Sequence, residues 1–112
     1  MIATQTNPHS YDFASLQSKI KGEILTDDYS LGMYSTDASF YQLMPLAIVL
    51  PMDEADVKAA VKFANDHHLK ILPRGGGTSL AGQTVGEALI IDFSKYMNKI
   101  IEFNERERWI KV

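Results

Sequence analysis

A run of five apolar residues, Leu46-Ala-Ile-Val-Leu50, constrains the fold of this chain more than any other feature. Uninterrupted apolar runs of this length are typical of strands that are covered on both faces, as in parallel sheets. Pro51 ends the run, because proline removes a backbone donor and interrupts pairing. The run therefore predicts a buried strand in a sheet that carries other elements on both of its faces.

A helix is expected directly after this strand. Asp53 stands at the N-cap position, and Glu54 and Asp56 fall in the first turn, where acidic side chains complement the helix dipole. Apolar residues then recur at helical spacing along one stripe: Val57, Ala60, Val61 and Ala64. A second strand begins at Ile71-Leu72. Strand, helix and strand within about thirty residues form a βαβ unit, which predicts a parallel pair with a right-handed crossover.

The remaining segments complete an α/β prediction. Residues 11–20 carry apolar side chains at helical spacing, and residues 23–45 have no clear period and are interpreted as a long connector. A third parallel strand is expected over Ala88–Phe93, and residues 99–103 and 109–112 form two arms of an antiparallel hairpin. The expected fold is thus three parallel strands with flanking helices, followed by the start of an antiparallel hairpin.

Length and composition exclude several classes of protein. With 112 residues the chain supports one modest core, which we divide into an N-terminal tail and helix (1–22) and the first part of a larger domain (23–112). Cysteine is absent, which excludes disulfides and thiolate metal sites. The formal charge is −3 with no basic run, so nucleic-acid binding has no electrostatic basis. The longest apolar run is interrupted by two prolines and is too short to cross a bilayer, so we expect a soluble chain.

The segment with the most chemical content is Pro73-Arg-Gly-Gly-Gly-Thr-Ser-Leu-Ala-Gly-Gln-Thr-Val-Gly86. Three glycines follow a predicted parallel strand, at the sheet edge where α/β proteins bind ligands. Glycine lets the backbone approach a ligand closely, so that several N–H groups can point at one anion. Thr78 and Ser79 add hydroxyl donors and Arg74 adds charge. The segment predicts binding of a phosphate or diphosphate.

Other interpretations of this glycine segment remain open from the residues alone. It could form only a tight turn. The dinucleotide fingerprint is not met, because Gly86 leads into a strand and not a helix. The spacing from Gly77 to Thr84 resembles a P-loop, but Gln83 stands where the phosphate-contacting lysine belongs. A non-redox phosphate- or nucleotide-binding module with a degenerate P-loop is therefore the alternative function.

The glycine segment, together with Asp92-Phe-Ser94 and Met97-Asn-Lys-Ile100, resembles the FAD-binding domain of the PCMH or vanillyl-alcohol oxidase type. Upstream, Tyr34-Ser-Thr-Asp-Ala-Ser-Phe-Tyr41 and Val49-Leu-Pro51 fit the same pattern. Within that superfamily the chain is most similar to the FAD-linked oxidases that include D-lactate dehydrogenase and the flavin-binding component of glycolate oxidase. This group contains long members with a C-terminal iron–sulfur region.

The resemblance implies which residues contact the cofactor. Backbone amides of the first part of the loop would wrap the FAD diphosphate, and the residues after it would line the next part of the cofactor channel. The implied cofactor-binding residues are Pro73, Arg74, Gly75, Gly76, Gly77, Thr78, Ser79, Leu80, Gly82, Gln83 and Thr84. Relatives with covalent flavin have a histidine where this chain has Thr78, so the FAD is expected to be non-covalent. No catalytic residue and no metal ligand is assigned in this chain.

The implied activity is oxidation of a D-2-hydroxy acid (lactate, glycolate or 2-hydroxyglutarate class) to the 2-oxo acid, with electrons passed on to a quinone, a cytochrome or an iron–sulfur centre. The flavin performs the chemistry, and the protein binds and orients it. The segment alone is expected to be inactive. An iron–sulfur cluster would lie outside this chain, and the expected location is cytoplasmic, either free or peripheral to the inner face of the membrane.

Several other polar residues have structural interpretations. His67 and His68 are expected to close the preceding helix, where a cation is favourable. Asp92 is expected to cap the turn that contains Ser94. The pair Asp27-Asp28 is interpreted as a solvated turn, because no third carboxylate follows at calcium-loop spacing. Two tyrosines, Tyr34 and Tyr41, are interpreted as packing the connector.

Overall fold

The computed structural model describes residues 10–112 and contains a four-stranded sheet. The strands are β1 (Glu23–Leu25), β2 (Ala47–Leu50), β3 (Ile71–Arg74) and β4 (Leu89–Asp92), in the spatial order β1-β2-β4-β3. Strands β2, β4 and β3 run parallel, and β1 pairs with β2 in the antiparallel direction. The three predicted parallel strands are therefore confirmed.

The crossover from β2 to β3 runs through helix α3 (Glu54–Asp66). Asp53 caps this helix by accepting a hydrogen bond from the backbone N–H of Asp56, as expected. The predicted strand–helix–strand unit is present and its strands are parallel, but they are not direct partners, because β4 lies between them. The chain thus returns from β3 to the middle of the sheet, and residues 75–88 make that return.

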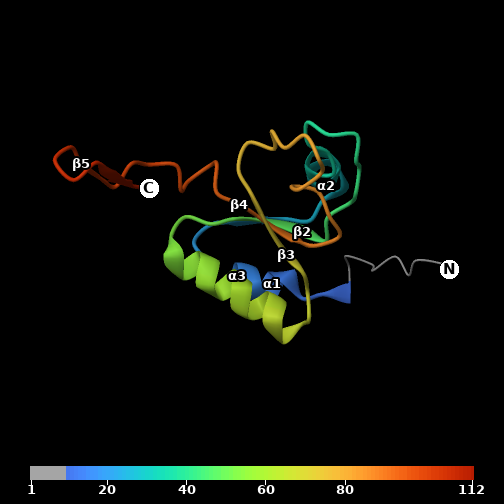
Figure 1. Cartoon of the computed structure of the whole chain (residues 1–112). Helices are drawn as coiled ribbons and strands as arrows, with labels where there is room; N and C mark the ends of the chain where they lie inside the picture. The colour runs from blue at the N-terminus through green and yellow to red at the C-terminus, as the bar shows by residue number, and fades with distance from the viewer. Residues whose placement is uncertain (1–9) are drawn as a thin grey trace.

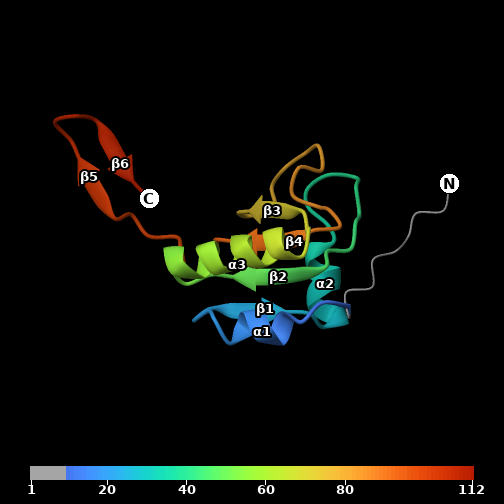
Figure 2. The ribbon, with the colours of Figure 1, turned by 90° about the horizontal axis from the view of Figure 1, so that it is seen from below.

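Both faces of the sheet carry a buried apolar core, which explains the uninterrupted apolar runs of β2 and β4. Figures 1 and 2 show helices α1 (Phe13–Gln17) and α3 on one face and helix α2 (Asp28–Tyr34) on the other. The first core contains Phe13, Leu16, Leu46, Ala47, Val49, Ala60, Phe63, Ala64, Leu89 and Ile91. The second core contains Leu31, Ile48, Leu50 and Ile90.

The interpretation of residues 23–45 as a connector without regular structure is wrong in its first half, where β1 and α2 lie. The strand has only three residues, and α2 buries a single side chain, Leu31, so neither leaves a periodic pattern. The interpretation of Asp27-Asp28 as a solvated turn is also wrong. Asp27 is the N-cap of α2, and its carboxylate accepts hydrogen bonds from the N–H and hydroxyl of Ser30.

A buried carboxylate joins α1, β1 and the start of α3. Asp56 is 2% exposed, and its two oxygens accept hydrogen bonds from the backbone N–H groups of Lys21 (2.9 Å), Gly22 (2.8 Å) and Met52 (3.0 Å). A Cβ at Gly22 would lie 2.0 Å from the carbonyl oxygen of Leu50, so only glycine fits there. The segment before the sheet is therefore fixed to it by backbone contacts.

The predicted hairpin is present as β5 (Glu102–Asn104) and β6 (Trp109–Lys111), paired in the antiparallel direction. Figures 1 and 2 show that it extends away from the four-stranded sheet. The N-terminal helix is shorter than residues 11–20, because α1 ends at Gln17, and most of the predicted N-terminal tail lies outside the described residues. Within residues 10–112 no helix is long and apolar enough to cross a membrane.

Candidate functional site

The glycine loop, residues 75–84, begins at the carboxyl end of β3. The partner residue of Arg74 in the parallel ladder is Asp92, so the ends of β3 and β4 lie side by side at the same edge of the sheet. A cavity of about 210 Å³ opens at this edge, lined by Met33, Tyr34, Arg74, Gly75, Gly76, Asp92 and Ser94. The loop thus stands where parallel α/β sheets bind their ligands.

The three consecutive glycines have two different environments. A Cβ at Gly75 would meet no atom within 4 Å, and one at Gly76 would meet only the methyl group of Thr78 at 3.6 Å. Both face open space beside the cavity. Gly77 has a φ of +68°, and a Cβ there would lie 2.5 Å from a guanidinium nitrogen of Arg74. The first two glycines therefore leave room for a ligand, and the third leaves room for an arginine of the chain itself.

The guanidinium of Arg74 is held on the carbonyl groups that surround the loop. Its nitrogen Nη1 donates to the carbonyl oxygens of Tyr34 (3.3 Å) and Thr84 (3.2 Å), and Nη2 donates to that of Thr36 (2.8 Å). The guanidinium carbon also lies 5.1 Å from the centre of the Tyr34 ring, a cation–π distance. Arg74 therefore connects the end of α2 with both ends of the glycine loop.

Residues 36–41, after α2, lie along the glycine loop, and Figures 1 and 2 show the two segments side by side. The hydroxyl of Thr84 donates to the Asp37 carboxylate at 2.9 Å, and the N–H of Ala38 donates to the carbonyl of Gly77 at 3.0 Å. Hydrogen bonding from Ser39, with a smaller effect of Thr84, holds the pKa of Asp37 below its ordinary value of 3.8. The carboxylate is therefore ionised at neutral pH.

The other predicted loop residues are placed as follows. Pro73 lies in β3, at the edge of the sheet, and Leu80 is 81% exposed. Gly82 has a φ of +77°, and a Cβ there would lie 2.6 Å from the ring of Tyr41. The side-chain oxygen of Gln83 accepts a hydrogen bond from the N–H of Ala81. The structure thus keeps the predicted residues in one continuous loop, with Arg74 and Thr84 turned toward the protein.

Half-buried Tyr34 and buried Asp92 form a hydrogen-bonded pair in the wall of the cavity. The Tyr34 hydroxyl donates to one oxygen of Asp92 at 2.5 Å, and the N–H of Ser94 donates to the other at 2.7 Å. The expected capping of the Ser94 turn by Asp92 is therefore confirmed. Burial, with the hydrogen bond to Asp92, raises the pKa of Tyr34 to about 12, so the phenol remains a donor. The sequence alone does not predict this contact, because 58 residues separate the pair.

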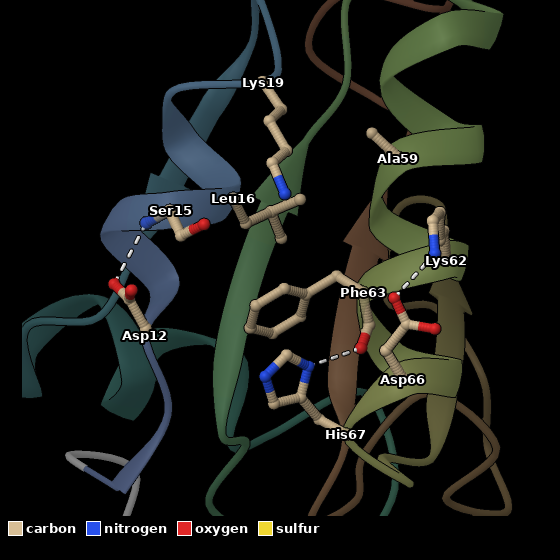
Figure 3. Close-up of a pocket in the computed structure, with 9 residues that line it drawn as sticks. All are labelled: Asp12, Ser15, Leu16, Lys19, Ala59, Lys62, Phe63, Asp66 and His67. Carbon is tan, nitrogen blue, oxygen red and sulfur yellow. Dashed lines mark hydrogen bonds and ion pairs between the residues drawn. The ribbon is translucent and has the colours of Figure 1, made fainter.

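A second cavity, of about 230 Å³, lies between α1 and α3, away from the glycine loop. Figure 3 shows Phe63 and His67 pointing from α3 toward α1, with the His67 ring stacked on Phe63 at 4.1 Å between centroids. His67 is the C-cap of α3, as predicted. The polar contacts of the cavity are local ones that stabilise the helices: Asp12 with Ser15, Lys62 with Asp66, and His67 with the carbonyl of Phe63. We therefore interpret this cavity as a gap in the packing between two helices and not as a ligand site.

Comparison with known families identifies the family of the chain. The family described as FAD binding domain matches residues 45–112, which include β2, α3, the whole glycine loop and the hairpin. The chain belongs to this family. The predicted resemblance and the predicted cofactor class, FAD, are therefore confirmed.

Individual relatives agree with the family. D-2-hydroxyglutarate dehydrogenase of Pseudomonas putida is 34% identical over 114 residues, which covers 99% of this chain and 11% of that protein. Glycolate oxidase subunit GlcD of Bacillus subtilis is 34% identical over 91 residues, 78% of this chain and 19% of that protein. The chain therefore spans less than a fifth of the length of these two relatives.

A solved structure shows the same fold. Alkyldihydroxyacetonephosphate synthase superposes with a TM-score of 0.74 at 20% identity, over 92% of this chain and 22% of that protein. This agreement confirms the predicted α/β fold class, and the family match places the fold in an FAD binding domain.

The residues around the cavity fit the diphosphate of FAD. Gly75 and Gly76 carry no Cβ that would fill the open side of the loop, so an anion can reach their backbone. Thr78 is exposed and Ser79 partly exposed beside them, so their hydroxyls extend the donor set. The charged side chains that line the cavity are Arg74 and Asp92, one positive and one negative. Attraction of a dianion must therefore come mainly from N–H dipoles. Among residues 10–112 no group of three His, Asp or Glu side chains could hold a metal ion.

Proposed function

We propose that the complete protein is an FAD-dependent dehydrogenase that oxidises a D-2-hydroxy acid, and that residues 73–84 bind the cofactor, with the backbone of residues 74–79 around its diphosphate. The observation that carries the proposal is the open backbone of Gly75 and Gly76 at the carboxyl end of β3, within a chain that belongs to the FAD binding domain family. The names of the two relatives above, which act on 2-hydroxyglutarate and glycolate, support the substrate class.

In this proposal the residues of this chain bind and orient the FAD. The N–H groups of residues 75–79 converge on the diphosphate, and hydrogen bonds to an anion are stronger than those between neutral groups. When bound, FAD accepts the two electrons that the hydroxy acid loses as it becomes the 2-oxo acid. Asp92 at the base of the cavity keeps the Ser94 turn in place through its hydrogen bond to the backbone.

The way in which FAD is attached, the electron acceptor and the location of the protein are part of the same proposal. Non-covalent attachment is supported by the absence of cysteine from the sequence and of histidine from the glycine loop. The electrons would pass to a quinone, a cytochrome or an iron–sulfur centre outside this chain. The protein would lie in the cytoplasm, either free or at the inner face of the membrane.

The complete gene product that contains this chain tests the function directly. Purified protein should be yellow, and its flavin absorption should bleach without oxygen when D-2-hydroxyglutarate, D-lactate or glycolate is added. The L-enantiomers of the first two serve as controls. A complete protein that takes up no added FAD would refute the proposal. Uptake of FAD without reduction by any of the three acids would favour the non-redox nucleotide-binding alternative.

The variant Gly76→Val tests the loop separately. Because a Cβ at Gly76 meets only Thr78 at 3.6 Å, the fold should tolerate valine, whereas its side chain would fill the space that the diphosphate needs. FAD affinity should fall at least about tenfold, the loss that roughly 1.4 kcal/mol represents. Gly32→Val is the matched control, because a Cβ at Gly32 also meets open space and the residue lies in α2. Normal FAD occupancy in Gly76→Val would show that the diphosphate binds elsewhere.

A further inference from the structure

We propose that Arg74, Asp37 and Thr84 are positioning residues, which brace the glycine loop from the protein side and do not themselves contact the diphosphate. The inference rests on the proposed binding of FAD by this loop and assigns a different role to two of the predicted cofactor-binding residues, Arg74 and Thr84. We call these three residues the brace.

The contacts of Arg74 show that its guanidinium is committed to the protein. It donates to three carbonyl oxygens, two from residues 34–36 and one from Thr84, at 2.8 to 3.3 Å. The missing Cβ of Gly77 makes room for it, since a Cβ there would lie 2.5 Å from Nη2. Three of its five N–H groups are used in this way, and turning the guanidinium toward an anion above the loop would break these hydrogen bonds and leave carbonyl groups unpaired. A cation with these hydrogen bonds stabilises the loop from the protein side.

The contacts of Asp37 also indicate that it holds the loop in place. Its carboxylate accepts from the hydroxyl of Thr84 at 2.9 Å and from the N–H of Ser39 at 2.8 Å, and the next residue, Ala38, donates to Gly77 at 3.0 Å. A carboxylate near a diphosphate repels it, so Asp37 would weaken binding if it acted by charge alone. Its position is understandable if its main effect is to anchor the far end of the loop.

Bracing matters because the outer part of the loop has few contacts of its own. Even a Cβ at Gly75 or Gly76 would meet almost nothing, and glycine loses more conformational freedom on ordering than any other residue. A loop anchored at its two ends, Arg74 and Thr84, and held in addition at Gly77 before FAD arrives has less entropy to lose on binding. The brace therefore acts on FAD affinity through the backbone between its two anchors.

Two pairs of variants of the complete protein test the brace by FAD affinity, measured from the quenching of flavin fluorescence. Asp37→Ala should weaken FAD binding about tenfold, of the order expected when a hydrogen bond to a charged group is lost. Asp37→Asn keeps one acceptor oxygen for the N–H of Ser39, and its amide N–H₂ can donate to the Thr84 hydroxyl, so both contacts survive without the charge. It should therefore bind FAD as well as the parent protein or better. Thr84→Val should weaken binding, and Thr84→Ser should restore it. Thr26→Val, an exposed threonine before α2, is the matched control.

The sign of the Asp37→Ala effect decides between the two explanations. If charge alone mattered, both Asp37 variants would tighten FAD binding, and that result would overturn the proposal. Unchanged affinity in Asp37→Ala and Thr84→Val would overturn it as well. Thermal unfolding of the same variants shows whether the fold is intact, and the conservative Asn and Ser variants keep the comparison valid if an Ala or Val variant is unstable.

Arg74→Lys separates bracing from direct contact with phosphate. Lysine keeps the charge, but it cannot reproduce the planar fork that spans three carbonyls. We expect Arg74→Lys to lower FAD affinity about tenfold. The double variant Arg74→Lys/Thr84→Val should bind FAD about as tightly as whichever single variant binds it less well, because both substitutions disrupt the same network. Full affinity in Arg74→Lys, or additive losses in the double variant, would show that Arg74 acts on the ligand by itself.

Hydrogen exchange keeps this test distinct from that of the proposed function. Without FAD, the amides of residues 75–84 should exchange faster in Asp37→Ala and Thr84→Val than in the parent protein, while those of β4 should not change. If the parent protein binds no FAD, the proposed function fails and the brace is judged on exchange alone. Equal exchange in parent and variants would overturn the brace whether or not FAD binds.

Discussion

Replacing Asp56 by alanine should destabilise this domain more than any exposed substitution near it. The carboxylate accepts three hydrogen bonds from backbone N–H groups, the one from Gly22 fully buried and those from Lys21 and Met52 partly buried. Each hydrogen bond to a charged group contributes about 1.5–3 kcal/mol, and water can reach the two partly buried donors. We therefore expect Asp56→Ala to lower the free energy of unfolding by about 3–5 kcal/mol, a large share of the roughly 6–17 kcal/mol typical of a domain of this size.

Two variants make this expectation specific. Asp56→Asn keeps one acceptor oxygen, which can serve Gly22 and Met52 from one side, but it turns an amide N–H₂ toward the N–H of Lys21. Its loss should be intermediate, about 1–3 kcal/mol. Asp53→Ala removes the half-buried N-cap of the same helix together with its ion pair to Lys21, and it should cost much less than Asp56→Ala.

Urea unfolding of the 112-residue chain, followed by far-UV circular dichroism, measures the three variants under one protocol. Equal slopes of the free energy against urea would show that the variants differ in stability alone. The reasoning would be refuted if Asp56→Ala unfolded at the same urea concentration as Asp53→Ala. In that case, the three backbone donors would find equally good partners in water, and the buried carboxylate would not join the N-terminal segment to the sheet.

Two further predictions concern pH. Hydrogen bonds from Lys95 and Tyr96 hold the pKa of Glu23 below 4.5, so its contribution to stability is present above that pH and is lost as the pH falls through the folded-state pKa. Glu23→Gln should flatten the acid limb of a plot of urea midpoint against pH, and an unchanged limb would contradict this. The pKa of Tyr34 is raised from 10.0 to about 12, so stability should fall between about pH 10 and about pH 12 as the unfolded phenol ionises. Tyr34→Phe should remove that part of the fall, and a phenol that ionises at its ordinary pH in the folded chain would be evidence against the pair with Asp92.

The central sheet and α3 could be predicted because their signals are local and strong. Strand β2 is buried at all four positions, which leaves an uninterrupted apolar run in the sequence. Helix α3 spans 13 residues with an aspartate cap at its start, long enough for a periodic stripe. Helix α2 has seven residues and includes a glycine, so its single buried residue, Leu31, shows no period. Its cap at Asp27 is visible in the sequence, but without a helical stripe after it the same pattern indicates a turn.

The position of β4 between β2 and β3 could not be predicted from the order of elements. A strand–helix–strand unit predicts parallel direction, and the direction is correct, but it does not determine whether a later strand inserts between the two. Strand β4 does so because it is buried on both faces, whereas β3 is not buried at any of its four positions. The more apolar strand takes the centre, and the strand with Pro73 takes the edge, where a missing N–H leaves no partner unpaired.

The contacts that the side chains of the glycine loop make could not be predicted from residue type alone. Residue type suggests that Arg74 supplies charge to a phosphate, and the family resemblance implies that Thr84 lines the cofactor channel. The structure pairs Arg74 with Thr36, 38 residues away, and Thr84 with Asp37, 47 residues away. Contacts at such separations depend on the whole chain, which brings the end of α2 beside the loop. The triple glycine then has two purposes that no composition count distinguishes: two members open a surface to a ligand, and Gly77 admits the side chain that holds that surface in place.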